Sequence, residues 1–321
     1  MEHESRPAPI TINGELFDVV KPTRLLPGMV LKSKTRDVYA RLGPKASALE
    51  EQIHTISLQE RGFPVANVLD SGEYGNDEWY FIEQSLGEAT FSQQFREEYL
   101  QDGKVSAPTH ESYLKVLDTY AAAQFDPANR THIAIEEFLE AAIPDSTIIA
   151  NYLQLGGDID RYHAAIKKAA DELRECPMGV LQLDLNPFNI LEGGVIDFEL
   201  VGYGPIGYDL LFCSRWHRWF TSDTASQYHL NYLLSPEQVA EADAIVTRYA
   251  EKYGLPSPTK HMAAFTLIKS AWGFTSTKTF DEEPESKQAF YRYRARILTL
   301  CVDAYLKGEA IDPLTFPEVR A

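Results

Sequence analysis

The chain has 321 residues, of which 44% are hydrophobic and 24% charged, which is enough for a full hydrophobic core and for two lobes. Its formal net charge is −17, which argues against DNA, RNA or an anionic membrane as the main partner because each requires a basic face. The three cysteines form no CxxC pair, as is typical of a reducing cytoplasm without disulfides or a zinc site. Neither a signal peptide nor a membrane-spanning apolar run is evident, so we expect a cytoplasmic protein.

The first part of the chain is rich in predicted strands. The segment ITINGELFDVV indicates two short strands around Asn13-Gly14, which is the strongest short hairpin signal. A second pair of strands follows in GMVLKSKTRDVYARLG, and a third pair in VANVLDSGEYGNDEWYFIEQ. Between these two pairs, KASALEEQIHTISLQERGF has a helical period that Gly62 ends. We therefore predict a β-rich lobe at residues 1–86.

From residue 87 onward the pattern is mainly helical. Helical periods occupy residues 109–125, 131–143, 160–176, 235–254, 260–279 and 284–307. Residues 180–200 are the only strand-like stretch that we predict in this part. The fold class is therefore α+β, with a small β-rich lobe joined near Leu86 to a large, mostly helical lobe at residues 87–321.

Two local signals refine the helical lobe. A capping box from Ser235 to Gln238, with Pro236 at the first helical position, opens one helix, and Gly254 closes it. The acidic run FDEEPES at residues 280–286 is predicted as a solvated loop between helices.

The stretch VLQLDLNPFNILEGGVIDFEL at residues 180–200 interrupts an apolar sequence with polar side chains, which are costly to bury without partners. Its ILEGGVID segment predicts a tight hairpin with Gly193-Gly194 in a type I′ turn. In that register Ile190 faces Asp197. Asn189 and Asp197 then lie together at the open end of the hairpin.

A third polar residue, Asp184, lies on the loop before this hairpin. Pro187 fixes its own φ and pushes Asn186 to an extended conformation, which restrains that loop. The side chains of Asp184, Asn189 and Asp197 are hard oxygen ligands that suit Mg²⁺. A magnesium ion with a free carboxylate nearby is the equipment that phosphoryl transfer requires.

These residues resemble the catalytic loop and metal hairpin of the aminoglycoside phosphotransferase and choline kinase-like family, whose pattern is HGDxxxxN followed by a hairpin and I-D-[FW]. Asp184 matches the catalytic aspartate, Asn189 the loop asparagine, and Asp197 the second metal ligand. The segment GYDLLF supplies Asp209, which the resemblance predicts to brace the catalytic loop from a helix start. The resemblance covers about residues 28–215 and implies a protein-kinase-like two-lobe fold that uses ATP or GTP with Mg²⁺.

The resemblance also implies nucleotide contacts in the β-rich lobe. Arg41 stands where the family often has a phosphate-binding lysine, and Glu51 is its candidate partner, with Glu50 as a competitor. Lys34 and its neighbours in the loop KSKTR would contact phosphates, and Gln84 to Leu86 would border the adenine through backbone groups. Arg41 as an exposed strand residue and Glu51 as part of a solvated helix face remain open, as does Asp209 as a helix cap unconnected to the site.

Three features depart from the family pattern. Gln182 and Leu183 replace the histidine and glycine of HGD, and the phosphate loop is not glycine-rich. Arg41 replaces the compact ammonium of a lysine with a planar guanidinium that has several donors. Gln182 can replace the hydrogen bonds of a histidine that supports the loop. These departures leave a second hypothesis open, a catalytically inactive nucleotide-binding scaffold of the same fold, and a third, a helical binding protein without nucleotide.

The leading hypothesis is an ATP- and Mg²⁺-dependent kinase for a hydroxyl of a small molecule, with an aminoglycoside-like amino-sugar or an amino-alcohol favoured. No nucleic acid or membrane partner is expected, and the protein is expected to be a monomer or dimer. Acidic residues that would suit a cationic acceptor, if they line the cleft, are Asp158, Asp160, Asp281, Glu282 and Glu283. Aromatic residues that pack in the core or form a cage for a quaternary ammonium group are Trp216, Trp219, Tyr228, Tyr232 and Trp272.

Overall fold

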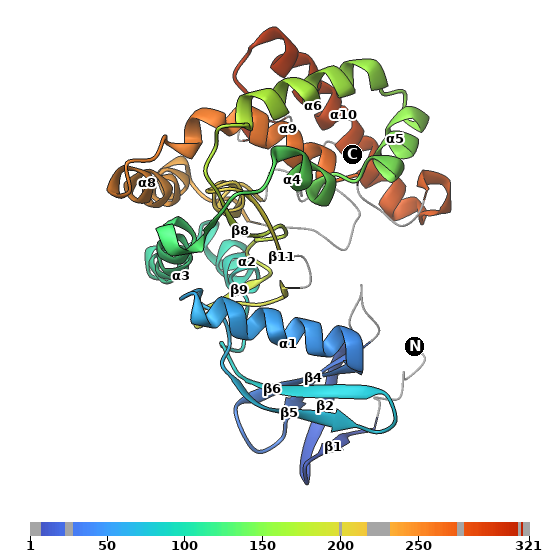
Figure 1. The fold of residues 1–321 in the computed structure, drawn as a ribbon, viewed down its shortest axis with the longest axis vertical. Helices are drawn as coiled ribbons and strands as arrows, with labels where there is room; N and C mark the ends of the chain where they lie inside the picture. Colours follow the sequence, from blue (N-terminus) through green and yellow to red (C-terminus); the bar gives the residue numbers. More distant parts are fainter. Residues whose placement is uncertain are drawn as a thin grey trace.

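The computed structural model of the protein describes residues 8–22, 28–198, 201–216, 232–274, 279–313 and 316. A sheet with one helix on it lies at one end, and a larger, mainly helical part lies at the other (Figure 1). The predicted α+β fold, with a small β-rich lobe and a large helical lobe, is confirmed.

The sheet is built from the three predicted strand pairs. Its strands are β1 Ile10–Ile12, β2 Glu15–Pro22, β3 Met29–Ser33, β4 Val38–Pro44, β5 Val68–Tyr74 and β6 Glu78–Gln84. Neighbours pair antiparallel in the order β1-β2-β3-β4-β6-β5. Asn13 and Gly14 have φ angles of 49° and 80°, as a type I′ turn requires, so the predicted hairpin is confirmed.

The predicted helix between the second and third strand pairs is α1, Lys45–Glu60, and Gly62 follows it with φ 81°. It lies between the sheet and the rest of the molecule (Figure 1). Leu58, near its end, and Phe63 and Val65, just after it, belong to the large core of the helical part. The segment after α1 thus ties the two lobes together by apolar burial.

The helical part contains six helices that the sequence predicts and others that it does not. The bounds are α2 Phe91–Asp102, α3 Ala107–Phe125, α4 Ile135–Ala142, α5 Asp145–Gln154, α6 Ile159–Leu173, α7 Leu210–Cys213, α8 Pro236–Lys252, α9 Met262–Trp272 and α10 Glu285–Lys307. Helix α2 was missed although a capping box from Thr90 to Gln93 opens it, because few apolar residues mark its face.

The two local predictions have different outcomes. The capping box from Ser235 to Gln238 is present at α8, which confirms that helix start. The solvated loop at residues 280–286 is wrong in part, because Phe280 and Glu283 are buried and α10 already begins at Glu285.

A second sheet crosses the helical part. It consists of β7 Arg130–Thr131, β8 Met178–Gln182 and β11 Val201–Pro205, in the order β11-β8-β7. The expectation of a single strand-like stretch at 180–200 is therefore wrong. Two glycines give the VGYGP sequence of β11 little strand propensity. The strand forms because it pairs antiparallel with the buried β8. In the described residues no helix is both long and apolar enough to cross a membrane.

Candidate active site

The hairpin of the 180–200 stretch forms, but not in the predicted register. Strand β9 is Ile190–Leu191 and β10 is Gly194–Val195, with Ile190 opposite Val195. The predicted pairing of Ile190 with Asp197 is therefore wrong, and so is the Gly193-Gly194 turn. The Ile196 amide donates to the Asn189 carbonyl at 2.9 Å, which still brings Asn189 and Asp197 together at the open end.

The two glycines are required for close approach rather than for a type I′ turn. The Gly193 amide donates to the Leu86 carbonyl at 2.8 Å, and the Val195 amide to the Pro64 carbonyl at 2.7 Å. A Cβ on Gly194, whose φ is 151°, would collide with the Pro64 carbonyl oxygen, and one on Gly193 would lie 2.8 Å from that of Leu86. The hairpin thus docks directly on the β-rich lobe and on the connection between the lobes.

Asp184 lies on the loop between β8 and β9, and this loop is held by its own asparagines. The Asp184 carbonyl accepts hydrogen bonds from Asn186 Nδ2 at 2.6 Å and Asn189 Nδ2 at 3.1 Å. Asn186 Oδ1 accepts from the Phe188 amide at 2.9 Å, which closes a tight turn. Because the Asn189 amide nitrogen is directed at the loop, its side-chain oxygen remains a candidate ligand for a cation.

The carboxyl of Asp184 is in an unusual environment. Its Oδ1 is buried and has no hydrogen-bond partner among the described residues. Burial raises the pKa of Asp184 to about 6, an effect that the charge of Lys269 opposes and that of Asp197 reinforces. A buried carboxylate oxygen without a hydrogen-bond partner is costly, so it marks a place for a ligand or a reacting group.

Gln182 and Asp209 connect this loop to its surroundings. Gln182 Nε2 donates to the Asp197 carbonyl at 2.7 Å, and the backbone of Asp197 has φ 67°. The backbone amide of Gln182 donates to Asp209 Oδ2 at 3.1 Å, and the side chains of Tyr120 and Gln124 donate to the same carboxylate. Asp209 also caps α7 through the Leu210 amide. Gln182 thus links the loop to the hairpin, and Asp209 links the loop to two helices.

Arg41 on β4 is buried among carboxylates. Its Nε lies 3.7 Å from Glu51 Oε1 and 3.3 Å from Glu83 Oε1, whereas Glu50 is exposed. Burial alone would lower the pKa of Arg41, but the charges of Glu83, Glu51 and Asp197 outweigh it and raise the pKa above its ordinary value. Sequence reasoning missed Glu83. A glutamate inside the otherwise apolar strand EWYFIEQ was the available signal.

The remaining predicted nucleotide residues lie around the β3–β4 turn and the connection. Lys34 Nζ lies 3.2 Å from Asp18 Oδ1, and Gln84 Oε1 accepts a hydrogen bond from Asn67 at 3.0 Å. The carbonyl of Leu86 accepts from Gly193, so Leu86 borders the hairpin.

The predicted phosphate loop itself is tied to β2. Arg36 Nε donates to both oxygens of Glu15 at 3.0 Å, and Ser33 bonds to the same carboxylate. Hydrogen bonds from Arg36 lower the pKa of Glu15 to about 2. The loop backbone is thereby fixed without glycines.

Lys269 on α9 is a further charged group at the site, and sequence reasoning missed it. Its Nζ donates to the Leu183 carbonyl at 3.0 Å and lies 3.7 Å and 4.9 Å from the ring centroids of Trp272 and Trp216. Burial lowers the pKa of Lys269 to about 8, which the charge of Asp184 opposes. A lysine inside the apolar helix MAAFTLIKSAW was the available signal.

The aromatic residues therefore do not form an open cage in the described part of the chain. The ammonium of Lys269 lies against Trp216 and Trp272, and Tyr232 packs edge-on against Phe95 at 5.4 Å between centroids. Core packing thus accounts for these three aromatic residues. Trp219 and Tyr228 lie outside the described residues.

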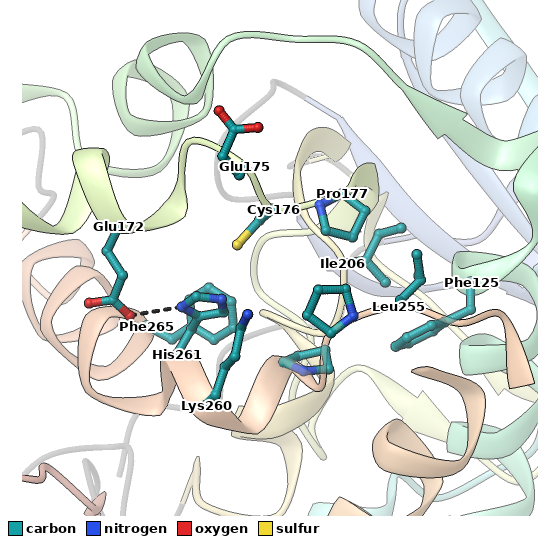
Figure 2. A pocket seen from close by; sticks show the side chains of 12 residues that line it. Phe125, Glu172, Glu175, Cys176, Pro177, Ile206, Leu255, Lys260, His261 and Phe265 are labelled. Carbon is teal, nitrogen blue, oxygen red and sulfur yellow. Dashed lines mark hydrogen bonds and ion pairs between the residues drawn. The ribbon is translucent and has the colours of Figure 1, made fainter. Parts of the chain in front are cut away.

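A pocket elsewhere in the helical part contains none of the predicted site residues. His261 Nδ1 lies 2.8 Å from Glu172 Oε1, and the side chain of Cys176 also lines the pocket (Figure 2). The other lining residues are Phe125, Glu175, Pro177, Ile206, Leu255, Pro256, Pro258, Lys260 and Phe265. Burial raises the pKa of Cys176 to about 11, so its thiol is not activated.

Comparison with known proteins identifies the class. The model of the phosphotransferase enzyme family matches residues 28–242, and the chain belongs to this family. Membership supports a phosphotransferase that acts on a small molecule. A search of curated proteins finds no match.

Solved structures show the same fold. A candidate aminoglycoside phosphotransferase from Ralstonia eutropha JMP134 is 14% identical with a TM-score of 0.58, over 92% of this chain and 94% of that chain. The aminoglycoside phosphotransferase APH(4)-Ia is 14% identical with a TM-score of 0.52, over 89% and 93%. A thermostable mutant of that enzyme, in a ternary complex with AMP-PNP and hygromycin B, is 15% identical with a TM-score of 0.51, over 89% and 93%. The expected fold, that of aminoglycoside phosphotransferases and protein kinases, is confirmed.

Proposed function

We propose that the protein transfers the γ-phosphoryl group of ATP, or of GTP, to a hydroxyl group of a small molecule. The observation that carries the proposal is the buried, unpartnered Oδ1 of Asp184, next to Asn189 and close to Asp197. In this assignment Asp184 orients the acceptor hydroxyl and accepts its proton. Arg41, held by Glu51 and Glu83, contacts the phosphates, and positioning with charge neutralisation supplies most of the catalysis.

Asn189 and Asp197 are the proposed magnesium ligands. Their oxygen donors suit a hard cation, and the amide orientation of Asn189 leaves its oxygen for one. In the part of the chain that the structure describes, no group of three or more His, Cys, Asp or Glu side chains forms a metal site. Two protein ligands fit Mg²⁺, which commonly takes its other ligands from phosphates and water. When bound, the ion would neutralise charge on the phosphates.

The contacts to ATP extend over the β-rich lobe. Lys34 and the restrained loop from Ser33 to Arg36 would face the phosphates, and backbone groups between Gln84 and Leu86 would border the base. We also propose the lobe boundary between residues 86 and 87, a cytoplasmic location, and a monomeric or dimeric state. These remain predictions.

The acceptor is proposed to be an amino-sugar or an amino-alcohol. Four of the five predicted acidic residues have structural partners or are buried: Asp158 caps α6, Asp281 bonds to Gln154, Glu282 caps a short 3₁₀ turn and Glu283 is buried. Cationic groups, Lys269 and Arg294, act on Asp184 instead. We therefore expect the reacting end of the acceptor to be neutral, with any amine further away.

An inactive nucleotide-binding scaffold is the second candidate. The observation that favours it is the pairing of Arg36 with Glu15 and of Lys34 with Asp18, which occupies cations of the predicted phosphate loop. Both candidates predict that ATP with Mg²⁺ raises the melting temperature. Only the kinase predicts ADP release that depends on an acceptor.

The deciding experiment measures ADP release and phosphorylated product with amino-sugars, amino-alcohols, neutral sugars and anionic alcohols as acceptors. Asp184→Asn is expected to retain nucleotide binding and to lose about 10²- to 10⁴-fold in turnover. Full turnover by that variant would refute the role of Asp184. Stabilisation by ATP without product from any acceptor would favour the scaffold.

A further inference from the structure

Lys269 lies behind the loop that carries Asp184, and the proposed function uses only its charge. Its exposed fraction is 3%, and its Nζ bonds to the Leu183 carbonyl at 3.0 Å. The indole rings of Trp272 and Trp216 cover the ammonium, with centroids at 3.7 Å and 4.9 Å. The ammonium is therefore enclosed by two aromatic faces and one carbonyl oxygen.

Stability alone does not account for an ammonium at this position. Removing a charge from water is costly, and the charge of Asp184 offsets only part of that cost, because the pKa of Lys269 is still lowered to about 8. Its neighbours along α9 include the buried apolar residues Phe265, Leu267, Ile268 and Ala271. What the lysine adds is a directed donor and a positive charge.

That donor is aimed at the peptide next to the proposed catalytic residue. The Leu183 carbonyl and the Asp184 nitrogen belong to the same planar peptide unit. The hydrogen bond from Lys269 to this carbonyl therefore fixes the orientation of the peptide plane that leads into Asp184. The following peptide unit is held at the Asp184 carbonyl by Asn186 and Asn189. Asp184 is thus restrained on both sides, from α9 on one side and from within the loop on the other.

We propose that Lys269 is a positioning residue that fixes the Leu183–Asp184 peptide and thereby directs the Asp184 carboxylate toward the acceptor hydroxyl. This inference rests on the proposed function, because it assigns Lys269 a part in the same reaction. Trp216 and Trp272 serve it by holding the ammonium in place. The side chain acts through the loop and does not contact the acceptor.

The first test needs no acceptor and compares amide hydrogen exchange at residues 182–189 in the wild type, Lys269→Met and Lys269→Gln, each with ATP and Mg²⁺. We expect exchange at these amides to accelerate at least tenfold in Lys269→Met, and less in Lys269→Gln, which keeps a donor. Lys269→Leu replaces the methionine variant if that variant lacks a cooperative melt.

Lys168 on α6 offers a control with the same kinds of contact at an exposed position. Its Nζ donates to the Tyr305 carbonyl at 2.7 Å and lies 4.8 Å from the Tyr305 ring, so it makes the same two kinds of contact away from the loop. Lys168→Met should leave exchange at residues 182–189 unchanged. Unchanged loop exchange in Lys269→Met, or an equal change in Lys168→Met, would overturn the inference.

The second test uses an acceptor that the wild type phosphorylates. Misplacement of Asp184 should lower kcat about 100-fold in Lys269→Met, while the KM for ATP stays within about twofold, and Lys269→Gln should recover part of kcat. A rise in the KM for ATP with unchanged kcat would also overturn the inference. A wild type that phosphorylates nothing would refute the proposed function, and the exchange experiment would still decide whether Lys269 holds the loop.

Discussion

Arg41 in the β-rich lobe and Lys269 in the helical lobe are both buried cations of the candidate site, but their surroundings differ. Arg41 lies 3.3 Å from Glu83 and 3.7 Å from Glu51, and these carboxylates raise its pKa. Lys269 faces two indole rings and a carbonyl oxygen, and burial lowers its pKa to about 8. Arg41 lies within ion-pair distance of two carboxylates, whereas Lys269 contacts aromatic faces and a carbonyl oxygen, and the charge of Asp184 offsets its burial only in part.

This difference shows that burial alone does not determine how a cation contributes to the stability of the fold. An arginine between carboxylates belongs to an ion-pair network whose disruption leaves unpaired charges. A buried lysine with a lowered pKa costs free energy while it is charged, even though the charge of Asp184 offsets part of that cost. The two sites should therefore respond differently to the same substitution and to pH.

The largest expected effect on stability is that of Arg41→Met. The substitution removes the charge of Arg41 from the mostly buried Glu51 and Glu83, and we expect a loss of about 3–5 kcal/mol in the free energy of unfolding, measured in urea. Arg36→Met is the control, because Arg36 pairs with Glu15 in the same lobe but its side chain is 51% exposed. A loss of at most about 1 kcal/mol is expected there. Similar losses in the two variants would contradict the comparison.

The two glutamates around Arg41 should contribute unequally. Glu83 is closer and accepts a hydrogen bond from Arg41 Nε at 3.3 Å, whereas Glu51 lies at 3.7 Å. We expect Glu83→Gln to lower the free energy of unfolding by about 1.5–3 kcal/mol and Glu51→Gln by less, in the same urea assay. The reverse order would mean that Glu51 is the main partner.

The lysine site should show a pH dependence that the arginine site lacks. The pKa of Lys269 is about 8 when folded, below its usual 10.5, so the cost of the buried charge is present below pH 8 and disappears as the pH rises. Relative to Lys269→Met, the wild type should gain roughly 2 kcal/mol between pH 7 and pH 9.5 in urea unfolding. A difference between the two proteins that does not change with pH would show that the lysine is not destabilised by burial.

A last prediction concerns turnover by the wild type. Asp184 accepts a proton only when ionised, and its pKa is raised to about 6 by burial, so activity should be present above this value and lost as the pH falls through it. We expect kcat/KM to fall about tenfold per pH unit below the pKa, at somewhat lower pH if Mg²⁺ binds nearby. Constant activity between pH 4 and pH 7 would remove Asp184 as the base.

The sequence predicted much of the architecture because its signals are local. The order of strands, helix and strands in the first 86 residues follows from turn residues and periodicity, as at Asn13-Gly14 and Gly62. The stretch with Asp184, Asn189 and Asp197 pointed to a family that is confirmed. Strand β11 was missed because its sequence has little strand propensity, and it exists by pairing with β8.

The sequence predicted the hairpin correctly, but for the wrong physical reason. Gly193 and Gly194 do mark a hairpin. Its register, however, goes with their close contact with Leu86 and Pro64, which are distant in sequence. A tight turn is a local property, whereas the collision that excludes a Cβ arises only when the two lobes meet. The sequence alone carries no signal for that approach.

By itself, the sequence determined the family, the two-lobe pattern and the polar residues of the 180–200 stretch, because these depend on residue type and short spacing. Only the tertiary structure placed Glu83 beside Arg41 and Lys269 behind Leu183. These pairs are separated by 42 and 86 residues, and each cation's pKa depends on groups that only folding brings together. The type of a side chain is a property of the sequence, whereas its pKa and its electrostatic environment are properties of the fold.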